Sequence, residues 1–532
     1  MNELIQPNEW RRYIWAALVF AVIFVVMEIV PTVSYMQKHE YGGRVIPEAE
    51  AERAGADFAS GHLGLSVDSA QAVHQTDKLL TGYLSKEKLL EQYEERYDKQ
   101  LPTDTYQVAV KFADRQGSGF VYVHMYNEAV TAWSFRVGGD IPAAEEQAAA
   151  VDATLKERLS LTDQFEAVDG SEKGRWTIFD PGNRIGEASL SASLETRTVN
   201  GKTIVTTYKP SFKAPSDYID YVEKQDKLAG WLVGVGYILM SIILGILAIV
   251  YAILYRKHTS FKYGSVLTAI FFVTYAVMNL NMIKGLQASQ GEQLMDNAFL
   301  VFTMILTVML SVPMAASIYF SLVAGDGLWK AQGRRLWPRL GEPGYGNHVW
   351  RSAGLSYLFA LIMLGLQPLI FRGLEFVIGT WSTSDVLMSP YNVSVLWLMP
   401  VLAWAAAISE EAVFRLFGIG LFRKWFRHTF AAALLPTFFW ALGHVNYPFY
   451  PSTTRLIELM IIGLMFSFIF VRYGFITAMF THAIFNSVAV ATMLFMAGSA
   501  ADMASAVFFI LLPVLIAYLL KLWNQKKTAS PV

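Results

Sequence analysis

The sequence predicts a mainly α-helical membrane protein, a polytopic bundle of about ten spans with an inserted α+β extracytoplasmic domain. Of its 532 residues, 54% are hydrophobic and only 16% are charged, whereas a soluble chain carries roughly a quarter charged residues. Long runs almost free of charge alternate with short polar pieces, and one polar stretch, residues 34–227, interrupts them. The excess of apolar residues therefore needs lipid rather than water as its solvent.

Ten segments are long and apolar enough to be spans. A span needs about 20 mainly apolar residues, because a helical residue rises about 1.5 Å and the hydrocarbon layer is about 30 Å thick. The spans are expected at residues 13–33, 228–255, 264–283, 297–323, 349–371, 393–417, 430–445, 456–471, 475–496 and 503–520. The seventh and the eighth are short.

Basic residues predict the orientation of these spans, because Lys and Arg of short loops tend to stay in the cytoplasm. With the N-terminus in the cytoplasm, the short outer loops hold only Lys284, Arg372 and Arg455. An even number of spans also returns the C-terminus to the cytoplasm, beside Lys521 and Lys526. We therefore expect a multi-pass protein of the cell membrane with both termini in the cytoplasm.

The first span allows two interpretations. Arg11 and Arg12 precede an apolar core, as they would in a signal peptide. However, no pair of small residues marks a cleavage site after it, and Glu28 lies near its outer end. We interpret residues 1–33 as an uncleaved transmembrane anchor.

Charge and cysteine content exclude several functions. A net charge of -1 gives no reason to expect nucleic acid as a partner. The chain has no cysteine, which excludes disulfides, thiol catalysis and metal sites of the cysteine type. The partners expected are the lipid bilayer, a membrane peptide or protein, and a ligand of the extracytoplasmic domain.

The polar stretch 34–227 has the pattern of an α+β domain. Apolar residues at three- and four-residue spacing predict a helix over residues 84–97. Alternating segments predict strands at residues 106–112, 119–125, 130–137, 189–198 and 203–208, with a turn at 114–119. Asn200-Gly201 is a strong hairpin signal between the last two strands. We expect two similar halves, each a helix followed by antiparallel strands, and find no catalytic constellation in them.

Ionisable residues inside spans are costly and often mark function. The sixth span ends in Ile408-Ser409-Glu410-Glu411-Ala412-Val413-Phe414-Arg415. The seventh contains Trp440-Ala441-Leu442-Gly443-His444, and the ninth contains His482-Ala483-Ile484-Phe485-Asn486. Each motif alone is weak, because charged pairs at helix ends and single histidines are usually structural. Their joint occurrence on separate spans favours one polar site.

Helix geometry separates the two adjacent glutamates. Glu411 and Arg415 are four residues apart and share a face, so they can form an ion pair that orients the acid. Glu410 lies about 100° further round the axis and can point into a cavity. A partly desolvated carboxylate there suits a general base that takes a proton from water.

The histidines allow two kinds of chemistry. His482 and Asn486 are four residues apart and project from one face of the ninth span. Glu410, His444 and His482 could ligate a divalent metal such as Zn²⁺ with a position left for water. Alternatively, these groups could polarise water and stabilise an oxyanion without a metal.

These three motifs together resemble those of the CPBP family, which contains the type II CAAX prenyl endopeptidases and related bacterial proteins. The resemblance covers roughly residues 349–520 and not the outer domain. It implies that Glu410 activates water with His444, while His482 and Asn486 hold the metal or the oxyanion. Glu411 and Arg415 would be structural and orienting. The aromatic residue before the first histidine is usually Phe in this family; here it is Trp440, a difference that concerns packing more than chemistry.

Hydropathy, composition and this resemblance together predict five regions. They are an N-terminal anchor (1–33), the extracytoplasmic domain (34–227), transmembrane helices of an accessory bundle (228–348), a CPBP-like catalytic transmembrane domain (349–521) and a cytoplasmic tail (522–532). The expected function is that of an intramembrane metalloprotease, an endopeptidase that hydrolyses a membrane-associated peptide or protein. The alternatives are a non-enzymatic receptor or bacteriocin-immunity protein, and an ion-coupled transporter that uses these residues as a relay.

The expected depth of one residue conflicts with this site. Glu410 approaches the cytoplasmic end of the sixth span, and His482 lies in the first half of the ninth, at a comparable depth. His444 comes late in the seventh span, which places it nearer the outside. Either that span is tilted or broken, or its boundaries are wrong.

Overall fold

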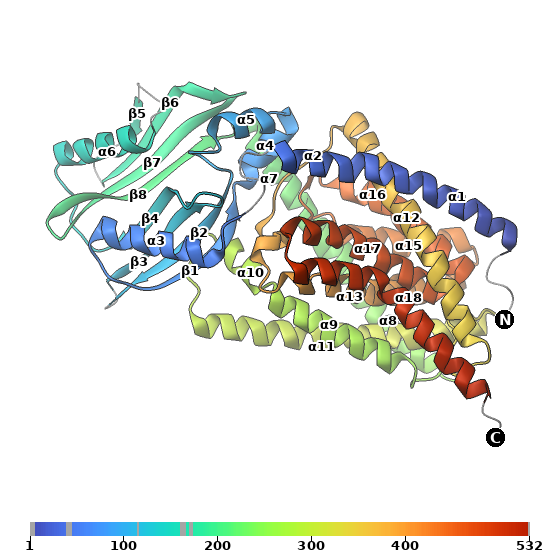
Figure 1. Cartoon of the computed structure of the whole chain (residues 1–532). Coiled ribbons are helices and arrows are strands. Elements are labelled where there is room, and N and C mark those ends of the chain that lie inside the picture. Colours follow the sequence, from blue (N-terminus) through green and yellow to red (C-terminus); the bar gives the residue numbers. More distant parts are fainter. Residues whose placement is uncertain (1–5, 39–44, 114–115, 160–165, 170–173, 530–532) are drawn as a thin grey trace.

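The structure is a computed structural model that describes residues 6–38, 45–113, 116–159, 166–169 and 174–529. It has two parts, a domain built on an eight-stranded antiparallel sheet and a bundle of long helices (Figure 1). The first helix begins and the last helix ends at the end of the bundle far from the sheet, so both described chain ends lie opposite the sheet domain (Figure 1).

The bundle is made of long apolar helices and the short elements between them. They are α1 (Pro7–Phe24), η1 (Val25–Ile29), α2 (Val30–Lys38), α7 (Ser216–Trp231), η3 (Leu232–Leu239), α8 (Met240–Leu254), α9 (Gly264–Asn281), α10 (Ile283–Ser289), α11 (Asn297–Ala331), α12 (Tyr345–Ile378), β9 (Trp381–Ser382), η4 (Val386–Met388), η5 (Pro390–Asn392), η6 (Leu396–Leu398), α13 (Pro400–Glu410), η7 (Glu411–Ile419), α14 (Gly420–Phe426), α15 (Thr429–Leu442), β10 (Phe449–Tyr450), α16 (Thr453–Tyr473), α17 (Phe475–Ala497) and α18 (Ala500–Ala529).

Within the described residues, nine helices are long and apolar enough to cross a membrane, and α15 is a shorter apolar helix. The predicted class, a polytopic helical bundle with an inserted α+β domain, is confirmed. The predicted seventh span corresponds to α15, whose 14 residues are about 21 Å long, less than the roughly 30 Å needed. Residues 443–452 complete the path to the sheet domain, so this crossing is a broken one.

The sheet domain contains α3 (Glu48–Leu63), β1 (Val67–Thr76), α4 (Lys78–Glu87), α5 (Leu90–Tyr97), β2 (Asp104–Phe112), β3 (Gly117–His124), β4 (Val130–Val137), α6 (Ala144–Arg158), β5 (Glu166–Asp169), β6 (Arg175–Ile185), β7 (Ala188–Val199) and β8 (Lys202–Lys213). The strand order is β1-β2-β3-β4-β8-β7-β6-β5. Each half is therefore a helix, α3 or α6, with four antiparallel strands, and the halves join through β4 and β8. The expected two similar halves are confirmed.

Local predictions in this domain differ in accuracy. The strand predicted at 130–137 is β4, and Asn200 and Gly201 have positive φ angles of 52° and 75°, as a two-residue hairpin turn requires. The helix predicted over 84–97 is wrong as one unit, because Lys88 takes a left-handed φ of 58° and separates α4 from α5. Residues 114 and 115 of the predicted turn lie outside the described residues.

Two residues of the bundle are buried in the hydrophobic core of the sheet domain. The bundle core is formed around α11 to α17, and a second core fills the sheet domain. Trp381 of β9 and Tyr450 of β10 come from the bundle, yet both are buried in the core of the sheet domain. Because β9 and β10 pair antiparallel, this two-stranded ribbon joins the membrane helices to the sheet domain.

Candidate active site

The structure brings together three of the four predicted catalytic side chains. The carboxylate of Glu410 lies 3.9 Å from Nε2 of His444 and 3.8 Å from Nε2 of His482. The side chains of Glu410 and His444 are 16% and 18% exposed, while His482 is almost completely buried. Side chains from three elements that are distant in sequence thus surround one small, partly open space.

Glu410 lies nearer the middle of its helix than the sequence indicated. The predicted sixth span ended at residue 417, but η7 and α14 continue the helix to Phe426. Within the candidate span Leu396–Phe426, Glu410 is therefore near the middle, whereas the predicted span 393–417 placed it near one end. It is the last residue before η7, a π-helical segment, and such segments are frequent at functional sites.

The broken seventh crossing resolves the conflict over His444. α15 ends at Leu442, and His444 follows in a tight turn, with its backbone N–H donating to the carbonyl of Ala441 at 3.1 Å. Because the helix stops short, His444 remains level with Glu410 on the neighbouring helix. The predicted span continued to Val445, but in the structure the helix ends at Leu442 and residues 443–446 form turns.

Hydrogen bonds at Nδ1 orient both imidazoles. Nδ1 of His444 lies 3.0 Å from the carbonyl oxygen of Trp440, and a carbonyl only accepts, so this nitrogen carries the proton. Nδ1 of His482 lies 2.9 Å from Oε1 of Glu411, and it donates to that carboxylate in the same way. Both Nε2 atoms therefore face Glu410 as lone-pair acceptors when the rings are neutral.

Glu411 and Arg415 form the expected ion pair. Nη1 of Arg415 lies 3.2 Å from Oε1 of Glu411, and both side chains are completely buried. The guanidinium makes no well-directed hydrogen bond; it lies 4.2 Å from the ring centre of Trp440 and 5.3 Å from that of Phe466. Glu411 thus links Arg415 to His482, and Phe466 stacks on His482 at 4.5 Å.

Asn486 lies one helical turn beyond His482 on α17 and is half-buried. Within the part of the chain that the structure describes, no hydrogen bond joins it to Glu410, His444 or His482. Asn486 therefore lies one turn from His482 on the same helix, without a hydrogen bond to the other three side chains.

Trp440 does more than pack. Its indole N–H donates a hydrogen bond to Oε2 of Glu410, and its ring makes edge contacts with both His444 and His482. A phenylalanine at this position could fill the space but could not donate. The sequence interpretation, in which Trp instead of Phe concerns packing more than chemistry, did not anticipate this hydrogen bond.

Whether the site suits a metal can be judged from its donors. Glu410, His444 and His482 are suitable ligand types for Zn²⁺, and the Nδ1 hydrogen bonds are of the kind that orient metal-bound histidines. However, no group of three or more His, Asp or Glu among the described residues is arranged so that it could hold a metal ion. The donor types suit a metal, and the chemistry proposed below does not depend on one.

A second polar cluster beside His444 was missed from the sequence. Glu458 is completely buried in α16, where it accepts hydrogen bonds from Gln367 at 3.0 Å and Arg455 at 2.9 Å. Tyr447 lies between this cluster and the site, with its ring 5.5 Å from His444 and 5.1 Å from the Arg455 guanidinium. Glu458 falls inside the predicted eighth span, so its charge was the signal that could have revealed the cluster.

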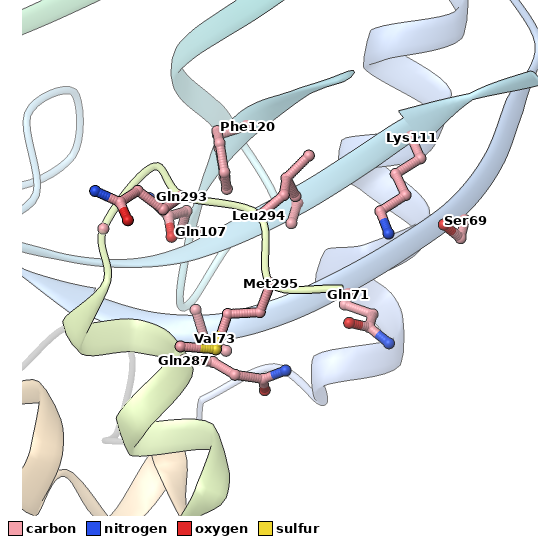
Figure 2. A pocket seen from close by; sticks show the side chains of 12 residues that line it. Ser69, Gln71, Val73, Gln107, Lys111, Phe120, Gln287, Gln293, Leu294 and Met295 are labelled. Carbon is pink, nitrogen blue, oxygen red and sulfur yellow. The ribbon is translucent and has the colours of Figure 1, made fainter. Parts of the chain in front are cut away.

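A separate cavity of about 180 Å³ lies away from these residues. It is enclosed between strands β1 to β3 of the sheet domain and the loop that follows α10 (Figure 2). Gln71, Gln107, Lys111, Gln287 and Gln293 supply polar groups, and Phe120 and Leu294 supply apolar ones (Figure 2). The sheet domain thus has a polar hollow at its junction with the bundle.

Comparison with known proteins identifies the part of the chain that holds the site. Residues 392–488 match the family model of the type II CAAX prenyl endopeptidase Rce1-like proteins. No curated protein and no solved structure matches the chain. The matched segment contains Glu410, Glu411, Arg415, Trp440, His444, His482 and Asn486, and it supports a CAAX-type intramembrane protease at the level of the family. Residues 392–488 are therefore similar to the Rce1-like type II CAAX prenyl endopeptidases.

Proposed function

We propose that this chain is an intramembrane endopeptidase in which Glu410 activates a water molecule. The observation that carries the proposal is the meeting of Glu410 with Nε2 of His444 and His482 at 3.9 and 3.8 Å. These separations are too long for direct hydrogen bonds. Two acceptors, an oxygen of Glu410 and Nε2 of His444, face this space and need a donor between them, and a water molecule supplies two protons there.

In the proposed reaction, Glu410 accepts a proton from this water as the water oxygen attacks the carbonyl carbon of a peptide bond. Negative charge then develops on the carbonyl oxygen. His482 stabilises it by donating from Nε2 in its protonated form, because the buried Glu411 carboxylate balances the positive charge of the ring. Asn486 supplies an amide beside it. Glu410 returns the proton to the leaving nitrogen as the C–N bond breaks, which leaves a carboxylic acid and an amine.

Trp440 and His444 position the reactants. The indole N–H holds one oxygen of Glu410, which leaves the other oxygen directed toward His444. Nε2 of His444 accepts a hydrogen bond from the second O–H of the water, because its Nδ1 already donates to the carbonyl of Trp440. The water is thereby held with its lone pair free for attack.

The test uses the full-length protein in liposomes with two kinds of probe. A farnesylated peptide that ends in a CAAX sequence tests the substrate class implied by the family. Mass spectrometry of new termini in a membrane-protein extract tests cleavage without assuming a substrate. Wild type should cleave and Glu410→Gln should not, while Glu95→Gln, an exposed glutamate of α5, should behave as wild type. Equal cleavage by wild type and Glu410→Gln would refute the proposal.

The same reconstituted protein separates the alternative functions. A transporter would move protons across the liposome membrane, and Glu410→Gln would reduce that flux. The cavity in Figure 2 favours ligand binding by the sheet domain as a second role. A small ligand of that cavity should bind equally well to wild type and to Glu410→Gln, because Glu410 does not line the cavity.

A further inference from the structure

His444 is placed by backbone outside any helix. Residues 443–452, here the His444 segment, follow α15 and contain one short strand, β10. Successive turns hold the chain, because Tyr447 N–H donates to the carbonyl of His444 at 3.2 Å and Phe449 N–H donates to that of Tyr447 at 2.6 Å. A displacement of Tyr450 is therefore transmitted through a short, hydrogen-bonded path to His444.

One continuous helix contacts the His444 segment on both sides of His444. Near its start, Asp226 accepts a hydrogen bond from the Tyr450 hydroxyl at 2.6 Å, and Gln225 accepts from both N–H and Oγ of Ser452 at 2.9 Å. Further along, in η3, the ring of Tyr237 packs so closely on Gly443 that a Cβ there would lie 2.7 Å from it. We call this continuous helix, Ser216–Leu254, the splint helix, because it contacts the His444 segment on both sides of His444.

The start of the same helix belongs to the sheet domain. Tyr218 and Val222 of α7 are buried in its core, together with Trp381 and Tyr450. Lys78 of α4 forms an ion pair with Asp226 at 2.8 Å. Thr383, next to β9, donates from its hydroxyl to the carbonyl of Lys78 at 2.6 Å. The sheet domain therefore contacts both α7 and the two-stranded ribbon β9–β10.

We infer that the sheet domain positions His444 for catalysis, and that Gln225, Asp226 and Tyr450 are positioning residues that act through the His444 segment. This inference rests on the proposed function. A reacting group must be held within a fraction of an ångström of its working position. His444 lies beyond the end of α15, so the helix does not fix its position. Contacts with the sheet domain and α7 hold the backbone of His444 in place.

The central experiment removes one hydrogen bond far from the chemistry. Tyr450→Phe deletes only the hydroxyl that Asp226 accepts, and it should lower kcat about tenfold with KM unchanged, because a small misplacement of a catalytic group is costly. Asp226→Ala should lose at least as much, because it also removes the ion pair with Lys78, and the double variant should lose no more than Asp226→Ala alone. Asp226→Asn, which keeps an acceptor for the Tyr450 hydroxyl, should recover most of the activity. Additive losses, or an unchanged kcat in Tyr450→Phe, would overturn the inference.

A matched control tests another contact between the two parts. Lys284 of α10 pairs with Glu48 of α3, so this ion pair also joins the bundle to the sheet domain, but neither residue touches the His444 segment. Lys284→Gln should leave kcat unchanged. A loss equal to that of Tyr450→Phe would show that domain docking in general matters, and not the splint helix.

A second readout is independent of any substrate. Backbone hydrogen exchange of residues 443–453, measured on the full chain in lipid nanodiscs, should accelerate in Tyr450→Phe and stay at the wild-type rate in Lys284→Gln. Unchanged exchange in Tyr450→Phe would refute the positioning role. If wild type cleaves no probe while exchange changes as expected, the peptidase proposal fails and the structural link between the domains stands.

Discussion

The indole N–H of Trp440 donates a hydrogen bond to the carboxylate of Glu410, from α15 to the end of α13. The two residues are thirty positions apart, and each belongs to a different motif of the proposed site. A hydrogen bond to a charged group contributes about 1.5–3 kcal/mol, which is enough to decide how a general base is held. The choice of Trp at this position therefore has a chemical consequence.

Trp440→Phe should keep the aromatic packing and remove the hydrogen bond. We expect kcat/KM to fall roughly tenfold to a hundredfold, because that range corresponds to the loss of one bond to a charged group. Initial rates on the cleavage probe measure it. Trp404→Phe is the matched control, since Trp404 is also buried, and its indole N–H has no hydrogen-bond partner. A Trp440→Phe enzyme as active as wild type would contradict the role given to this bond.

Glu411→Gln should destabilise the protein strongly. The variant leaves Arg415 as a buried charge without its partner, and breaking a buried ion pair in this way costs about 3–5 kcal/mol. Thermal unfolding in detergent, followed by tryptophan fluorescence, measures the loss. Arg472→Gln breaks the exposed pair with Glu9, which should cost much less, because solvent screens exposed ion pairs. Similar midpoints for the two variants would argue against a structural role for Glu411.

Gly443→Ala tests the contact between the splint helix and the His444 segment. The added methyl would lie 2.7 Å from the ring of Tyr237, so the segment must shift and kcat should fall. Tyr237→Leu in the same chain should relieve the clash and restore part of the activity. Gly230→Ala, on the same splint helix with open space around its Cβ, should have no effect on rate. An unchanged kcat in Gly443→Ala would mean that the segment adapts freely.

The sheet domain should lose stability below neutral pH. Burial lowers the pKa of His62 and of His124 below the ordinary value of 6.5, and the nearby Asp98 only partly opposes this for His124. A depressed pKa means that the folded state favours the neutral rings. The stabilisation is therefore present above about pH 6.5 and is lost as the pH falls below it.

Hydrogen exchange of strands β3 and β8 at pH 7.5 and pH 5 measures this effect, after correction for the intrinsic rate. His62→Phe should weaken the pH dependence, because Phe can keep the ring contacts that His62 makes with Phe58 and Trp133 but cannot bind a proton. Identical pH dependence in this variant would exclude His62 as a contributor.

Chelation should leave peptidase activity intact. The proposed chemistry relies on Glu410 and the two imidazoles, which are not arranged to hold a metal among the described residues. Wild-type enzyme incubated with a strong chelator and then assayed should retain its rate, with metal content measured on the same sample. Loss of activity that Zn²⁺ restores would favour the metal alternative that the donor types also allow.

Hydropathy and helical spacing in the sequence were enough to predict the membrane spans, the inserted domain and the main residues of the site. The spans, the inserted α+β domain and the grouping of Glu410, His444 and His482 follow from one-dimensional patterns, because a helix must be long and apolar to cross lipid. Residues four apart share a helical face, which predicted the pairing of Glu411 with Arg415. The Asn200-Gly201 turn followed from its dipeptide alone.

Other features were decided only when distant segments packed together. The left-handed Lys88, the hydrogen bond from Trp440 to Glu410 and the burial of Trp381 and Tyr450 in the sheet domain leave no periodic signal in the sequence. Each depends on a partner far along the chain. The position of His444 is the clearest case, because the irregular segment after the 14-residue helix is held by contacts with α7 and η3 and by the pairing of β10 with β9. Local sequence sets which elements can form, and tertiary contacts set where their polar groups meet.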